Sequence, residues 1–209
     1  MKRLLLLGLL MCAAPAFAAE EAAADPFVNG HAQAGTAKAA TCAACHGPDG
    51  NSANPEWPKL AGQSSKYIYE QLVAFKSQTR KQAIMMGQAT TLSDQEMRDV
   101  AAWFAGQTQK PGVANPASVK VAEKIFRAGD ASRGLPACAG CHGPKGLGNP
   151  AAGYARIGGQ HATYTANQLK SFRSGERNTG ANGQMMTAVA TKLTDAEIDA
   201  LASYVNGLQ

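Results

Sequence analysis

In TCAACHGPDG, residues 41–50, two cysteines and a histidine fall within five residues. A second stretch, PACAGCHGPKG at 136–146, repeats this pattern 96 residues further on. Each stretch has the spacing Cys-X-X-Cys-His, and the residues concerned are Cys42, Cys45 and His46, and Cys138, Cys141 and His142. Any chemistry assigned to these cysteines must also explain why a histidine follows each pair.

The rest of the chain repeats in the same way. GQSSKYIYEQLVAFKS, from residue 62, matches GQHATYTANQLKSFRS, from residue 159, and LSDQEMRDVAAWF, from residue 92, matches LTDAEIDALASYV, from residue 193. A repeat of this length predicts two similar domains, and the Pro- and Gly-containing segment GQTQKPGVANP at 106–116 predicts a connection between them. We therefore place an N-terminal domain at 19–107, a linker at 108–116 and a C-terminal domain at 117–209.

The first 18 residues have the features of a secretory signal peptide. Two basic residues at 2–3 precede an apolar run at 4–14, and Ala-Phe-Ala at 16–18 is typical of a cleavage site. The alternative is a membrane anchor, but the run is short for a bilayer span. We expect export to the periplasm, with a peripheral membrane association left open. Cleavage would also remove Cys12, so that the four remaining cysteines all lie in the two motifs.

Each half of the chain has a helical pattern, and no run alternates with the period of a strand. Two apolar stripes have the spacing i, i+3, i+4, i+7: Met97, Val100, Ala101 and Phe104, and Ile198, Leu201, Ala202 and Val205. Capping boxes at 93–96 and 194–197 predict where these two helices begin. Further helices are predicted around 68–75 and 165–172, at 116–129, and more weakly at 31–40. The predicted fold class is therefore all-α, with two tandem domains.

The cysteine motifs could bind zinc, form disulfides or attach haem covalently. A zinc ribbon needs its two Cys-X-X-Cys halves roughly 15–20 residues apart, and here each half lies in its own domain. A thioredoxin-like dithiol is expected beside a strand and a helix, and a disulfide framework leaves the histidines unexplained. Covalent haem fits best, because both thiols form thioethers and the adjacent histidine becomes the proximal iron ligand. Two haem c groups would also supply the apolar core that domains of this size lack.

The sixth iron ligand can be sought among the methionines. The candidates are Met85, Met86, Met97, Met185 and Met186. Counting back seven residues from the motifs LSD and LTD gives Met85 in one copy and Met186 in the other. Met86 aligns with a threonine, and Met185 and Met97 each align with an isoleucine. The repeat therefore favours Met85 and Met186, although adjacent methionines leave an error of one residue open.

Two other histidines, His31 and His161, are not matched by a histidine in the other copy of the repeat. His161 aligns with Ser64, so a symmetric pair of sites cannot use it as a ligand in both copies. We expect His161 to be an exposed residue near the start of a helix, and His31 to be solvated. Bis-histidine ligation is therefore the less favoured alternative.

Taken together, these motifs resemble the cytochrome c4 family over essentially the whole chain after residue 18. The matching segments are CAACHGPDGNS, PKLAGQ, CAGCHGP, GGQHATYTANQL, AIMMG and GQMMTAV. The resemblance implies two class I cytochrome c domains related by a pseudo-twofold axis, each wrapping a haem with His/Met ligation. It also implies electron transfer from a quinol-oxidising cytochrome bc complex to a terminal haem-copper oxidase. Pro58, whose carbonyl such proteins often offer to the proximal histidine, aligns with Ala155 in the second copy.

The predicted ligation points to a carrier and not an enzyme. An iron bound by histidine and methionine has no open position for a substrate, and thioether ligation raises its potential. We expect redox proteins as partners, and neither nucleic acid nor a small-molecule substrate. Two alternatives remain: the cytochrome subunit of a flavocytochrome c, and a dihaem redox enzyme such as a peroxidase or a thiosulfate-oxidising enzyme.

The two halves also differ in charge. Residues 19–114 contain 8 Lys and Arg against 9 Asp and Glu, whereas residues 115–209 contain 10 against 6. Positive surroundings disfavour the ferric state, so the haem of the second domain is predicted to have the higher potential. The difference is expected to be modest, because surface charges are screened by salt.

Overall fold

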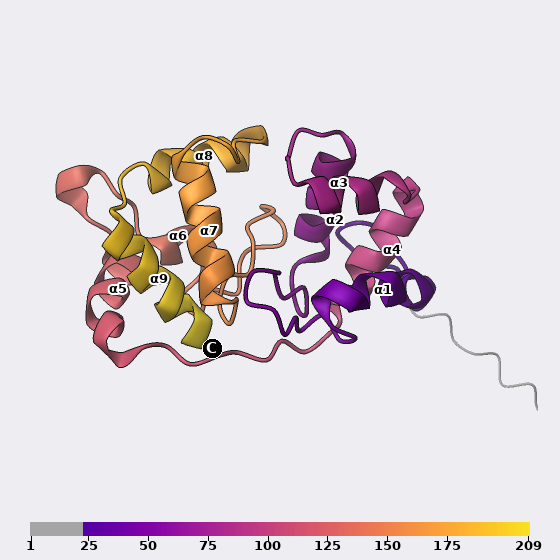
Figure 1. Ribbon diagram of the computed structural model, residues 1–209, viewed down its shortest axis with the longest axis horizontal. Coiled ribbons are helices and arrows are strands. Elements are labelled where there is room, and N and C mark those ends of the chain that lie inside the picture. Colours follow the sequence, from indigo (N-terminus) through magenta and orange to yellow (C-terminus); the bar gives the residue numbers. More distant parts are fainter. Residues whose placement is uncertain (1–22) are drawn as a thin grey trace, which may run out of the picture.

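The computed structural model describes residues 23–209, and the predicted signal peptide lies outside this range. Two groups of helices stand side by side, and a single extended segment joins them along one edge (Figure 1). The first group comprises α1 (Ala32–His46), α2 (Ser65–Lys76), α3 (Ala83–Thr90) and α4 (Asp94–Ala105). The second comprises α5 (Pro116–Ala128), the short 3-10 helix η1 (Ala131–Arg133), α6 (Cys138–His142), α7 (Ala162–Arg173), α8 (Gly180–Ala190) and α9 (Asp195–Gly207). Residues 23–209 form no strand beyond isolated bridges, which confirms the all-α class.

The last helix of each group organises the core around it. α4 contacts α1 and α2, and α9 contacts α5 and α7. The predicted apolar stripes of α4 and α9 are buried along their whole length, as the periodicity indicated. Both predicted capping boxes are also formed, at Ser93 with Glu96 and at Thr194 with Glu197. The sequence therefore located these two helices correctly.

The two copies differ just before the Cys-X-X-Cys-His motif. In the first domain α1 runs without a break through the motif, whereas the predicted helix covered only 31–40. In the second domain α5 ends before Gly129, which has φ 67°, a conformation that glycine adopts readily. A Cβ at Gly129 would lie 2.3 Å from the carbonyl oxygen of Leu135. The chain then turns through η1 and starts the motif on the separate helix α6.

Sequence patterns missed the two helices that carry the methionines. α3 and α8 have no continuous apolar stripe, and each contains glycine, which disfavours helix. They form because tertiary packing holds them: α3 lies against α2, and α8 lies against α7. Among the helices of residues 23–209, none is long and apolar enough to cross a bilayer.

Candidate functional site

The histidine of each motif has one ring nitrogen engaged and one available. His46 Nδ1 lies 2.9 Å from the carbonyl oxygen of Pro58, and His142 Nδ1 lies 2.8 Å from that of Ala155. When Nδ1 donates to a carbonyl, Nε2 keeps its lone pair and can bind a metal. Burial lowers the pKa of both imidazoles, which favours the neutral, metal-binding form. The replacement of Pro58 by Ala155 in the second copy thus leaves the carbonyl acceptor in place.

The four cysteines are free thiols, so the structure contains no disulfide between them. Burial raises the pKa of the Cys42 thiol, and burial raises the pKa of Cys138 to about 11. A dithiol redox centre needs a thiolate of low pKa, so the raised pKa values of Cys42 and Cys138 do not suit disulfide exchange. They do suit covalent attachment, since the two cysteines and the histidine of each motif share one short helical segment.

The methionines differ in exposure. Met97 is 3% exposed in the core of the first domain, as its place on the apolar stripe predicted. Met185 is 44% exposed, whereas Met186 is partly buried. Met85 and Met86 are both partly buried and pack against the same apolar cluster as Cys42. These exposures favour Met186 over Met185, and Met85 remains the prediction for the first domain.

A reciprocal set of hydrogen bonds joins the two domains. Gln160 Oε1 accepts from the Lys59 amide at 2.8 Å, and Gln160 Nε2 donates to the Lys59 carbonyl at 2.9 Å. Gln63 makes the same two bonds to the backbone of Arg156, both at 2.8 Å. Gln63 and Gln160 are equivalent positions of the repeat. The contact therefore has the pseudo-twofold symmetry that the resemblance to the cytochrome c4 family implied.

Two arginines lie between the domains with a second symmetric network. Arg80 donates to Gln71 at 2.8 Å in its own domain and to Gln168 at 3.0 Å in the other. Arg177 donates in turn to Gln168 at 2.7 Å and to Gln71 at 3.1 Å. Each also donates across the interface to a tyrosine, Tyr164 for Arg80 and Tyr67 for Arg177.

No carboxylate bonds either guanidinium in the part of the chain that the structure describes, although Arg177 is only 8% exposed. A buried charge requires a partner of opposite sign. Haem carries two carboxylates, the propionates, so this pair of arginines fits that group. The donor set therefore agrees with haem on three counts: free, partly buried thiols, available imidazole nitrogens, and a buried and a half-buried arginine with no carboxylate partner among residues 23–209.

His161 corrects one expectation. It lies at the start of α7, as predicted, but it is half-buried and not exposed. Its Nε2 lies 2.8 Å from the Ser52 carbonyl oxygen in the other domain. The side chain is thus a contact between domains. His31 likewise is only partly exposed, and its Nδ1 is buried, so it is not a solvated residue.

No role was predicted for the polar residues between the domains. A signal was present, because four pairs of the polar residues that bond across the interface are identical in the two copies of the repeat: Gln63 and Gln160, Tyr67 and Tyr164, Gln71 and Gln168, and Arg80 and Arg177. Identity at a buried apolar position can reflect packing alone, whereas repeated polar identity indicates a shared contact.

The helical fold and the two Cys-X-X-Cys-His sites define a c-type cytochrome with two covalently attached haems. The family model for cytochrome c matches residues 32–108 and 122–209. Over 188 residues the chain is 47% identical to cytochrome c4 from Stutzerimonas stutzeri, with 86% of this chain and 90% of that protein covered. The chain belongs to the cytochrome c4 family, and it is a dihaem electron-transfer protein.

Other relatives agree with this assignment. The crystal structure of reduced recombinant cytochrome c4 from Pseudomonas stutzeri superposes with a TM-score of 0.84 at 46% identity, covering 86% of this chain and all of that one. A protein named thiosulfate dehydrogenase electron acceptor, from Thiomonas intermedia, is 34% identical over 95% of this chain and 86% of its own length. The architecture of two tandem class I cytochrome c domains is therefore shared with known proteins.

Proposed function

We propose that this protein carries electrons in the periplasm from a quinol-oxidising cytochrome bc complex to a terminal haem-copper oxidase, and that it is a carrier and not an enzyme. The observation that carries this proposal is the matched pair of sites, each with an available histidine nitrogen and a partly buried methionine. We assign the axial ligands as His46 with Met85, and His142 with Met186. The domain limits of 19–107 and 117–209 are part of the same proposal.

The ligand set accounts for carrier behaviour. When bound, a haem held between an imidazole nitrogen and a thioether sulfur exchanges one electron and has a raised potential. The histidine and methionine assigned to each site would hold the iron and so exclude water and substrates from it. The carbonyls of Pro58 and Ala155 fix the imidazole tautomer through the Nδ1 hydrogen bond, which would leave the Nε2 lone pair free to bind the iron.

The ligand assignment can be tested by alanine substitution. We expect Met85→Ala and Met186→Ala to retain both haems and each to abolish one of the two ferric sulfur-to-iron absorption bands. The neighbouring variants Met86→Ala and Met185→Ala are matched controls and should retain both bands. Loss of a band in Met86→Ala but not in Met85→Ala would show that the first assignment is wrong by one residue.

The route of electrons can be tested with purified partners. In stopped-flow experiments the ferric protein should be reduced by a cytochrome bc complex supplied with quinol, and the ferrous protein should be oxidised by a haem-copper oxidase in air. The named relative from Thiomonas intermedia suggests thiosulfate dehydrogenase as a competing donor. Reduction by that enzyme with thiosulfate, and none by the bc complex, would refute the proposed donor.

The flavocytochrome alternative makes a different prediction. A cytochrome subunit of a flavocytochrome should copurify with a flavoprotein as a stable complex. We expect this protein to purify alone, with two haems and no flavin absorbance.

A further inference from the structure

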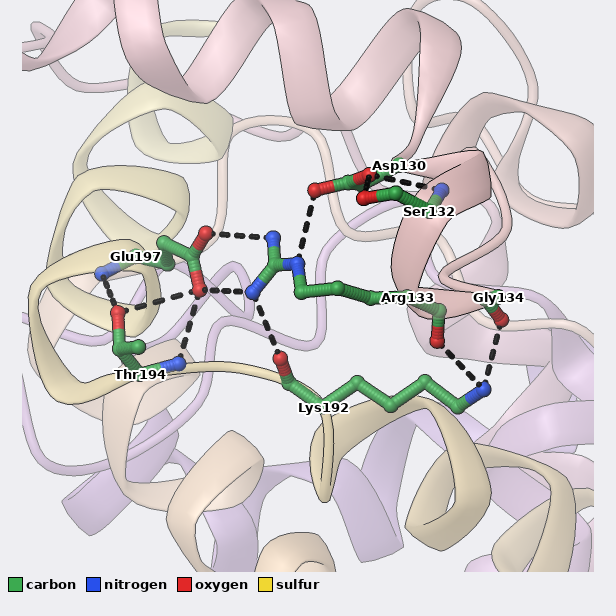
Figure 2. A network of polar contacts seen from close by, with 7 residues as sticks. All are labelled: Asp130, Ser132, Arg133, Gly134, Lys192, Thr194 and Glu197. Carbon is green, nitrogen blue, oxygen red and sulfur yellow. Dashed lines mark hydrogen bonds and ion pairs between the residues drawn. The ribbon is translucent and has the colours of Figure 1, made fainter.

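The segment that precedes the second haem-binding motif is fastened to the turn between α8 and α9 (Figure 2). Arg133, at the end of η1, donates to both carboxylate oxygens of Glu197, at 2.7 and 3.1 Å. It also donates to the Lys192 carbonyl at 3.0 Å. Lys192 returns the contact, since its Nζ donates to the carbonyls of Arg133 and Gly134 at 3.1 and 2.8 Å. We call Arg133, Lys192 and Glu197 the clamp.

Both ends of the clamp are themselves held in position. Asp130 accepts from Arg133 Nε at 2.8 Å, which fixes the plane of the guanidinium. Glu197 accepts from the amide of Thr194 at 2.9 Å as part of the capping box of α9. A two-bond contact between a guanidinium and a carboxylate fixes orientation as well as distance. The clamp is therefore a rigid connection between two parts of the chain.

With the ligands assigned as proposed, these two parts lead to the two iron ligands of the second haem, His142 and Met186. Arg133 lies five residues before Cys138, on the side where attachment and the proximal histidine are located. Lys192 lies six residues after Met186, in the turn that follows the helix bearing this methionine. Haem attachment at Cys138 and Cys141 would fix the first part covalently, whereas α8 contains two glycines, which lower its intrinsic helix propensity. Movement of α8 away from the attachment side would stretch the clamp.

We propose that Arg133 is a positioning residue which, through Glu197 and Lys192, holds α8 so that Met186 stays on the iron. This inference rests on the proposed assignment of Met186 as an axial ligand. Its consequence is that the clamp limits the access of competing ligands to the second haem.

The first domain has a weaker counterpart. There Lys38 on α1 pairs with Glu96, the capping-box residue equivalent to Glu197, at 2.6 Å. The side chains of Lys38 and Glu96 are 46% and 30% exposed, against 35% and 17% for Arg133 and Glu197. The ammonium group of a lysine is also a point charge, whereas the planar guanidinium group of an arginine can bind a carboxylate through two hydrogen bonds. The first haem should therefore exchange its methionine for an added ligand more readily than the second.

The test is imidazole binding to the ferric holoprotein, with each haem followed by the NMR signal of its own bound methionine. An exposed ion pair adds little to stability, and a pair joined by two hydrogen bonds adds somewhat more. Because a weaker clamp would let imidazole displace Met186 more easily, we expect Arg133→Gln to raise imidazole affinity at the second haem about fivefold. Arg133→Lys should give a smaller increase, because it restores the charge without the planar guanidinium group. Arg127→Gln is the matched control, because Arg127 pairs with Glu123 within α5 and does not contact the α8–α9 turn.

The outcomes separate this inference from the ligand assignment. If Met186→Ala leaves the second methionine signal intact, the ligand assignment is wrong and the inference falls with it. If Met186→Ala abolishes that signal but Arg133→Gln leaves imidazole affinity unchanged, or raises it equally at both haems, the clamp alone is refuted. Should Arg133→Gln fail to mature, Glu197→Gln breaks the same ion pair and must show the same increase at the second haem.

Discussion

We expect the substitution Gln160→Ala to uncouple the two domains. The Gln160 side chain is 6% exposed and bonds both backbone groups of Lys59 across the interface, at 2.8 and 2.9 Å. Its removal leaves a buried N–H and a buried C=O without partners. A hydrogen bond contributes about 1 kcal/mol net, and an unpaired buried group costs about 1–3 kcal/mol. The free energy of unfolding should therefore fall by about 2–4 kcal/mol, the lower figure applying if water enters the opened contact.

Two probes of thermal unfolding distinguish uncoupling from general destabilisation. Both tryptophans, Trp57 and Trp103, lie in the first domain, so fluorescence follows that domain, whereas far-UV circular dichroism follows all helices. In the unsubstituted protein the two transitions should coincide. In Gln160→Ala they should separate, and the first midpoint should fall by about 5–15 °C.

Matched variants make this experiment decisive. Gln63→Ala breaks the equivalent pair of bonds to Arg156 and should behave in the same way. Gln33→Ala removes an exposed glutamine from α1 and should change neither the midpoint nor the coincidence of the two probes. Coincident transitions in Gln160→Ala, with the midpoint of Gln33→Ala, would show that the reciprocal contact does not couple the domains.

Three further predictions concern the haems and the effect of pH. Cys42→Ser combined with Cys45→Ser should remove one haem and destabilise chiefly the first domain; a domain that keeps its helicity and thermal stability would contradict a haem core. A redox titration that assigns each haem by its methionine signal should place the second haem about 20–40 mV higher, because its domain is the more basic, and the opposite order would contradict this reasoning. The hydrogen bond from Arg133 lowers the pKa of Glu197 from its usual 4.5 to about 2, so the stability due to this pair is present above pH 4.5 and is lost as the pH falls towards 2. Circular dichroism should show a smaller loss over that range for Arg133→Gln, and an unchanged loss would refute the role of the pair.

The attachment chemistry and the division of the chain into two halves could both be predicted from the order of the residues. The two thiols and the histidine of each motif must be close together for covalent haem, and five consecutive residues bring them together without help from the rest of the fold. The repeat then gave two domains, and helical periodicity with capping boxes located α4 and α9. These features depend on residues that are close together along the chain, so they can be predicted from sequence patterns.

The contact between the two halves could not be predicted in this way and is seen only in the folded protein. Gln160 and Lys59 are separated by 101 positions, and their pairing depends on which faces of two folded domains come into contact. The same holds for Arg80 and Arg177, which meet between the domains without a carboxylate partner among residues 23–209. α3 and α8 belong with these contacts, because packing and not local propensity makes them helical. The haem-attachment motif consists of adjacent residues, whereas contacts across an interface exist only after both surfaces have formed.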